Sequence, residues 1–193
     1  MLARTLPALI NIAITGSLKR TNLLLYWQPN LQSETPMPFS HLGLSDLLLK
    51  TLADLGYVQP TAIQQLAIPA ILDGRDIMAS SPTGTGKTAS FVLPMLENLV
   101  TSNTLRGKRI RALILTPTRE LAVQVAASVE QYAQHLNLSC MAMYGGTDSE
   151  TQKQRLLAGV DVVVATPGRL LDMAFQRALH FDALEVLVLD EAD

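Results

Sequence analysis

The chain has 193 residues, of which 48% are hydrophobic, and its formal net charge at pH 7 is -2. This apolar content excludes a disordered chain, and the length is sufficient for one domain with a core of its own. The charge excludes a global basic field, so any nucleic-acid binding must come from a local patch. The single cysteine, Cys140, cannot form an intrachain disulfide, which suits a reducing compartment. No apolar run approaches the roughly 20 residues of a membrane span, so we expect a cytoplasmic protein with no membrane partner.

Residues 1–36 differ from the rest of the chain, because they carry apolar patches and no acidic residue before Glu34. A signal peptide is one interpretation, although no clear small-residue cleavage site follows the apolar part. An amphipathic targeting segment is a second, and an extension upstream of a true start at Met37 is a third. We favour the extension, because the ordered pattern begins at Met37. The domain is therefore expected to span 37–193 and to be independent of the residues before it.

From Met37 onward, apolar segments with the period of strands alternate with segments that have the period of helices. This alternation predicts an α/β fold, in which a parallel sheet carries helices on both faces. Ligands then bind beyond the carboxyl ends of the strands. Strands are expected at 76–80, 110–115, 138–144, 160–165 and 186–189, and helices at 45–56, 61–74, 89–100, 119–135, 149–157 and 167–175.

A glycine-rich loop separates the strand at 76–80 from the next helix, which is the setting of a phosphate-binding loop. Two glycines let the backbone curl so that several N–H groups face phosphate oxygens, and the start of the helix adds positive potential. Lys87 supplies a charge for the β- and γ-phosphates, and the Thr88 hydroxyl is a Mg²⁺ ligand. A plain glycine-containing turn is the less favoured alternative. The loop comprises Ser81, Pro82, Thr83, Gly84, Thr85, Gly86, Lys87 and Thr88.

The first position of this loop departs from the usual pattern, because Ser81 stands where glycine is common. Serine is compatible with the loop only if residue 81 needs no positive φ.

An acidic cluster, Asp190-Glu191-Ala192-Asp193, follows four apolar residues. Asp190, at the end of a strand, can hold Mg²⁺ through water, and Glu191 can polarise an attacking water. An acidic turn after a core strand is the alternative, and it is disfavoured by the phosphate loop earlier in the chain.

The stretch from Gly56 to Gln64 permits two interpretations. Thr61 and Gln64 have the spacing of a capping box that begins a helix. The Gln64 amide could instead read adenine, because one donor and one acceptor match N7 and the 6-amino group. The spacing alone favours the cap.

Three further segments each end a strand and begin a loop or helix. They offer free N–H groups, hydroxyls or arginines, which are groups that hold phosphates without reading bases. Helix caps explain each of them singly, but three on one edge of a sheet are harder to dismiss. The candidate residues are Pro117, Thr118, Arg119, Gly145, Gly146, Thr166, Pro167, Gly168 and Arg169.

Together, in this order and spacing, these segments resemble the motifs of the DEAD-box RNA helicases over residues 37–193. The amino-acid sequence of the loop at 81–88 is similar to that of bacterial members, including one linked to assembly of the large ribosomal subunit. The resemblance implies a RecA-like first domain that uses ATP and Mg²⁺. It implies that Gln64 recognises adenine, which reverses the preference above, and that Phe39 stacks on the base. Tyr57 is a further predicted nucleotide-binding residue.

The resemblance further implies catalytic roles for Lys87, Asp190 and Glu191, with Thr88 and Asp190 serving Mg²⁺. The nine candidate residues at the sheet edge would line the path of single-stranded RNA and hold mostly its phosphate backbone. Ribosome-assembly or RNA-decay factors are the partners that the resemblance suggests.

The chain departs from the family pattern because it stops at Asp193, before the next motif and the second RecA-like domain. We therefore expect an incomplete domain, with a central strand missing between the phosphate-loop strand and the Asp190 strand. A chain of this kind should be inactive alone. The alternatives are a nucleotide- or RNA-binding module without turnover and a P-loop ATPase that acts on DNA.

Overall fold

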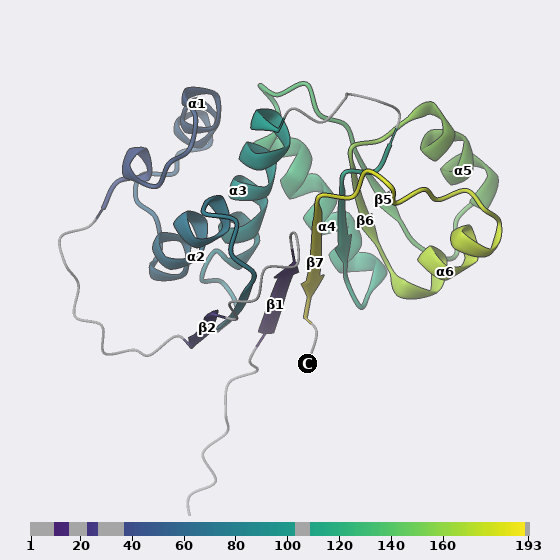
Figure 1. Ribbon diagram of the computed structural model, residues 1–193, viewed down its shortest axis with the longest axis horizontal. Helices are drawn as coiled ribbons and strands as arrows, with labels where there is room; N and C mark the ends of the chain where they lie inside the picture. The colour runs from purple at the N-terminus through teal and green to yellow at the C-terminus, as the bar shows by residue number, and fades with distance from the viewer. Residues whose placement is uncertain (1–9, 16–22, 27–36, 103–108, 192–193) are drawn as a thin grey trace, which may run out of the picture.

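The computed structural model describes residues 10–15, 23–26, 37–102 and 109–191 (Figure 1). Seven strands form one sheet in the order β2-β3-β1-β7-β4-β6-β5. The strands are β1 (Ile10–Thr15), β2 (Leu23–Tyr26), β3 (Ile77–Ser81), β4 (Ala112–Leu115), β5 (Cys140–Met143), β6 (Val162–Ala165) and β7 (Val186–Asp190). The helices are the 3-10 turn η1 (Phe39–His41), α1 (Asp46–Asp54), α2 (Ala62–Leu72), α3 (Lys87–Thr101), α4 (Arg119–Tyr132), α5 (Ser149–Ala158) and α6 (Pro167–Phe175).

The alternation of strands and helices expected after Met37 is confirmed, with ends that move by a few residues. The sheet is flanked by helices, and β7, β4, β6 and β5 pair in parallel. None of the helices in the described part of the chain is long and apolar enough to cross a bilayer.

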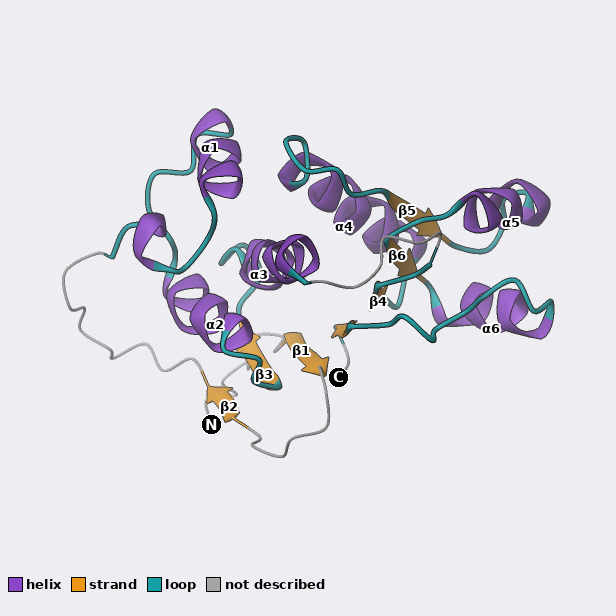
Figure 2. Ribbon diagram, turned by 45° about the horizontal axis from the view of Figure 1, so that its top comes forward, coloured by secondary structure: helices purple, strands orange, loops and turns teal. Residues whose placement is uncertain are grey.

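Two apolar cores lie on opposite faces of the sheet, because successive side chains of a strand point to opposite sides. In β4, Ala112 and Ile114 join the core formed with α1 to α4, whereas Leu113 joins the second core. The second core also contains Leu156 of α5 and Met173 of α6. Figure 2 shows α1 to α4 on one side of the sheet and α6 on the other.

The centre of the sheet differs from the expectation. The strand β1, from the segment before Met37, lies between β3 and β7 and runs antiparallel to both. Ile12 aligns with Ala79 on one side and with Asp190 on the other. The expected gap between the phosphate-loop strand and the Asp190 strand is therefore not present, because β1 fills it. The division of the chain at Met37 stays a prediction.

A buried arginine ties the amino ends of two strands to α3. Arg111 is 2% exposed, and its Nε lies 2.6 Å from Glu185 Oε1 while its Nη2 donates to the Leu99 carbonyl at 2.6 Å. Because a buried guanidinium must be paired, this cluster fixes the end of α3 against β4 and the segment before β7. The other end of α3 carries the phosphate loop.

Candidate functional site

The phosphate loop connects the carboxyl end of β3 to the first turn of α3. Gly84 and Gly86 have φ of +79° and +84°, which favours glycine at both positions. A Cβ at Gly86 would lie 2.4 Å from Gln64 Nε2, so the loop also packs too closely for a side chain. Ser81 is the last residue of β3 and is not one of the described residues with positive φ. The condition that serine had to satisfy at this position is therefore met.

Hydrogen bonds within the loop hold its curled shape. The hydroxyls of Ser81 and Thr85 lie 2.7 Å apart, and Thr85 Oγ1 donates to the Pro82 carbonyl at 2.8 Å. Lys87 is buried, and its Nζ donates to the Ser81 carbonyl at 2.5 Å. The lysine thus reaches across the mouth of the loop, where a bound phosphate would offer it a stronger, charged acceptor.

Asp190 and Glu191 are the two residues of the acidic cluster that the structure describes, and they lie at the carboxyl end of β7. Burial, reinforced by the negative charge of Glu191, raises the pKa of Asp190 to about 6, while the charge of Lys87 opposes the rise. Glu191 has a φ of +53°, an uncommon backbone conformation for a residue with a side chain. Burial therefore favours the protonated form of the Asp190 carboxyl group over its anion, unless a cation binds beside it.

The loop and the end of β7 line the same cavity, which has a volume of about 430 Å³. Lys87 and Thr88 line it from α3, and Asp190, the last residue of β7, and Glu191, which follows it, line it as well. A third wall comes from α4, which the sequence interpretation did not include. The α4 residues in this wall recur at helical spacing, a signal that the sequence contains: they are Leu121, Gln124, Val125, Ser128 and Tyr132.

Of the three residues outside the loop that are predicted to bind the adenine nucleotide, only Tyr57 lines the cavity. The Tyr57 hydroxyl lies 2.7 Å from that of Tyr132. Phe39 is 5% exposed in the core, with its ring edge-on to Tyr57 at 6.3 Å between centroids. Gln64 Oε1 accepts from Thr61 N at 2.9 Å, which confirms the capping box, and its Nε2 donates to the Gly86 carbonyl at 3.1 Å. Adenine recognition by Gln64 and Phe39 stays a prediction.

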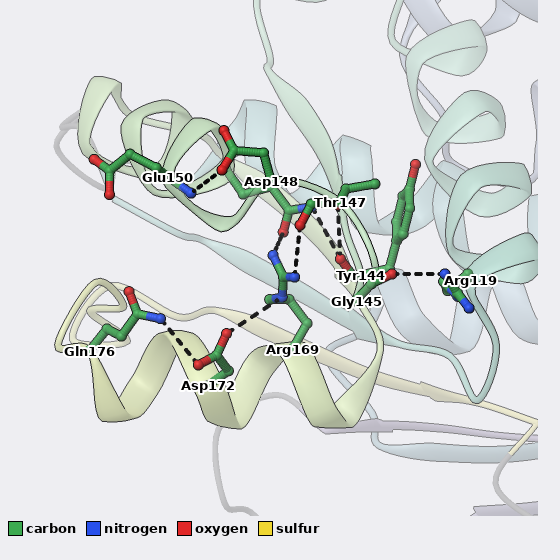
Figure 3. A network of polar contacts seen from close by, with 10 residues as sticks. Arg119, Tyr144, Gly145, Thr147, Asp148, Glu150, Arg169, Asp172 and Gln176 are labelled. Atoms are coloured by element: carbon green, nitrogen blue, oxygen red, sulfur yellow. Dashed lines mark hydrogen bonds and ion pairs between the residues drawn. The ribbon is translucent and has the colours of Figure 1, made fainter.

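The three segments expected to meet RNA come together around a second cavity, of about 570 Å³. We call this cavity the rim. It contains the candidate residues except Pro167, which is exposed at the start of α6. Arg119 is exposed, and its Nη1 donates to the Gly145 carbonyl at 3.2 Å (Figure 3). The rim also contains two carboxylates that the sequence interpretation missed, Glu120 and Asp172.

Comparison with known proteins supports the assignment. A family model described as DEAD/DEAH box helicase matches residues 61–193. The chain belongs to the DEAD/DEAH-box helicase family. The chain is 45% identical over 159 residues to the ATP-dependent RNA helicase SrmB of Escherichia coli, covering 82% of this chain and 36% of that protein. It is 45% identical over 155 residues to the RNA helicase CrhR of Synechocystis sp., covering 80% of this chain and 30% of the relative.

A third relative has a similar sequence identity to this chain. The probable ATP-dependent RNA helicase ddx27 of Dictyostelium discoideum is 46% identical over 164 residues, covering 84% of this chain and 21% of that protein. The chain thus spans between about a fifth and about a third of the length of these helicases.

The close approach of Arg119 to the glycine pair gives a first test of this DEAD-box site. Gly146 has a φ of +85°, and a Cβ there would lie 2.3 Å from Arg119 Nη1. Gly146→Ala is therefore expected to lower the free energy of unfolding by about 1–2 kcal/mol and to displace the arginine. Gly145→Ala is the matched control, because Gly145 has no atom within 4 Å of its Cβ position and should change stability by less than about 0.5 kcal/mol. Equal effects of the two substitutions in urea titrations would contradict this packing.

The pKa of Asp190 gives a second test. Its pKa is raised from 3.8 to about 6, so in the folded state it keeps a proton that the unfolded state releases as the pH rises from about 4 to 6. The free energy of unfolding therefore falls over this window and stays lower above it. Asp190→Asn should remove that loss and make the Mg²⁺-free protein more stable at pH 7 by roughly 1–3 kcal/mol. Asp182→Asn, at an exposed carboxylate, is the control, and an Asp190→Asn effect that is the same at pH 4 and pH 7 would contradict the assignment.

Proposed function

We propose that this chain binds ATP with Mg²⁺ in the cavity beside the phosphate loop and single-stranded RNA at the rim, as part of an ATP-dependent RNA helicase. The observation that carries the proposal is that Lys87 and Thr88, at the start of α3, line one cavity with Asp190 and Glu191, at the end of β7. Both sites lie beyond the carboxyl ends of parallel strands, where ligands of open α/β sheets bind.

The residues present fit a magnesium nucleotide. The backbone N–H groups of the loop and the buried Lys87 ammonium suit the β- and γ-phosphates, and the Thr88 hydroxyl and the Asp190 carboxylate are hard oxygen ligands. Mg²⁺ would supply positive charge that neutralises the phosphates and the buried carboxylate. Glu191 would orient the attacking water and accept its proton.

Hydrolysis by this chain alone is expected to be slow. Lys87 is the only cationic side chain among the described residues that line the cavity. An additional arginine at the γ-phosphate can be worth about 10³–10⁵ in rate, so the complete helicase would need such a group from elsewhere.

RNA would be held by its backbone. The rim combines the exposed Arg119 with the amino ends of α4 and α6, which present N–H groups toward an anion. Such groups do not read bases, so affinity should depend on salt much more than on RNA sequence. A cytoplasmic location and partners from ribosome assembly or RNA decay belong to the same proposal.

The test combines binding and turnover. The chain is titrated with a fluorescent ADP analogue in Mg²⁺ and with labelled single-stranded RNA, and ATP turnover is measured with and without RNA. Nucleotide and RNA binding with slow turnover is expected. Binding of guanine and adenine nucleotides with equal affinity, or of DNA in preference to RNA, would contradict the proposal. Fast RNA-independent turnover would contradict the requirement for an additional arginine.

A further inference from the structure

The rim is an anion-binding surface with no net charge, although it would bind phosphates. Its charged lining residues are Arg119 and Arg169 on one side of the balance and Glu120 and Asp172 on the other. A carboxylate beside a phosphate weakens binding through like-charge repulsion.

Three protein groups contact the guanidinium of Arg169. Its Nη1 donates to Gln152 Oε1 at 3.0 Å and its Nη2 to the Thr147 carbonyl at 3.0 Å, while its Nε lies 3.6 Å from Asp172 Oδ2 (Figure 3). The Arg169 side chain is 9% exposed. Its orientation is therefore fixed by two full hydrogen bonds to neutral acceptors, and Asp172 is the longest of the three contacts.

Gln152 explains why Arg169 does not need the Asp172 carboxylate to hold its position. Gln152 is nearly buried, and its Nε2 donates to Thr147 Oγ1 at 2.6 Å and lies 3.2 Å from the Tyr144 carbonyl. It thus joins the end of β5, the loop after it and Arg169 of α6. Removing the charge of Asp172 would leave this network in place.

Asp172 is placed to compete with RNA. Its side chain is 49% exposed and lines the rim one helical turn after Arg169, on α6. Its other oxygen, Oδ1, accepts from Gln176 Nε2 at 3.1 Å, a bond that an asparagine oxygen would also accept. Glu120, by contrast, lies in the first turn of α4, where a carboxylate complements the helix dipole.

We propose that Asp172 determines the affinity of the rim for RNA: its carboxylate neutralises Arg169 and repels the RNA phosphates, so that RNA binds weakly and is released. The inference rests on the proposed function, because it requires that RNA binds at the rim. A phosphate that approaches Arg169 must share the guanidinium with Asp172.

The test is a gain of affinity, which a damaged fold would not produce. Binding of a fluorescently labelled single-stranded oligouridylate is measured by anisotropy at several salt concentrations. Asp172→Asn is expected to bind about three- to tenfold more tightly than the unaltered chain. The slope of log affinity against log salt should become steeper by about 0.7, which corresponds to one more phosphate contact on a single strand.

The matched control is Asp182→Asn. It removes the same charge from an exposed carboxylate that pairs with Arg109, near the amino ends of the strands and away from the rim. It should change RNA affinity by less than about twofold. The gain from Asp172→Asn should be smaller when Arg169 is replaced by Gln, because only the direct repulsion between Asp172 and the phosphates is then relieved.

The outcomes separate the inference from the function on which it rests. Unchanged or weaker binding by Asp172→Asn, in a chain whose RNA binding is weakened by Arg119→Ala, would overturn the inference alone. So would an equal gain from Asp182→Asn. RNA binding that neither Arg119→Ala nor Asp172→Asn alters, or no RNA binding at all, would overturn the proposed function together with it.

Discussion

Lys87→Ala is expected to lower the affinity for magnesium adenine nucleotides by about 10- to 100-fold. The ammonium group is buried at the mouth of the phosphate loop, where it already donates to the Ser81 carbonyl and faces Asp190 across the cavity. A hydrogen bond to a charged group contributes about 1.5–3 kcal/mol, and 1.4 kcal/mol is a factor of ten in affinity. The loss should appear in titrations with a fluorescent ADP analogue.

The control is Lys50→Ala, which removes an exposed lysine on α1 and should leave nucleotide affinity unchanged. RNA affinity should be nearly the same in both variants, because the rim does not contain Lys87. Nucleotide affinity that survives Lys87→Ala would mean that the cavity beside the loop is not the nucleotide site.

Removal of residues 1–36 is expected to destabilise the domain severely. The strand β1 pairs with β3 on one side and with β7 on the other, so its loss would leave two strand edges unpaired in the centre of the sheet. Each buried backbone group without a partner costs about 1–3 kcal/mol, against a total domain stability of about 5–15 kcal/mol. The truncated chain should show no cooperative thermal transition.

This expectation is opposite to the one drawn from composition, which treated the segment as independent of the domain. Removal of residues 1–9 alone is the control, because it keeps both β1 and β2. A chain beginning at Met37 with an unchanged thermal midpoint and unchanged nucleotide affinity would show that the sheet does not need β1.

Local sequence patterns predicted most of the fold. Apolar runs bounded by glycine or polar residues predicted every strand and helix from α1 to β7, because each run must bury one face and end where the chain turns. The ends moved where pairing partners decide them: the strand expected from Ile110 begins at Ala112 in the structure. The strand β1 was not predicted, because its pairing partners lie far along the chain and no motif marks the segment before Met37.

The loop at 81–88 and the acidic residues after β7 could be singled out for the same local reason, because their candidate chemistry lies in consecutive residues. Their roles stay a prediction. The structure added what depends on distant contacts. The α4 wall of the cavity beside the loop and the contact between Gln152 and Arg169 each involve residues from separate elements. Gln64 both caps α2 and donates a hydrogen bond to the Gly86 carbonyl. The second contact could not be predicted from the sequence, because it depends on how close α2 lies to the loop.

One edge of the sheet is expected to carry two separate sites, one for a magnesium nucleotide and one for RNA. Hydrogen–deuterium exchange of the chain, measured with Mg-ADP and then with single-stranded RNA, tests both together. Mg-ADP should slow exchange in the loop at 82–88, and RNA should slow it at 117–120, 145–147 and 166–169. Slowed exchange outside these segments, with the loop and the rim unchanged, would contradict the account.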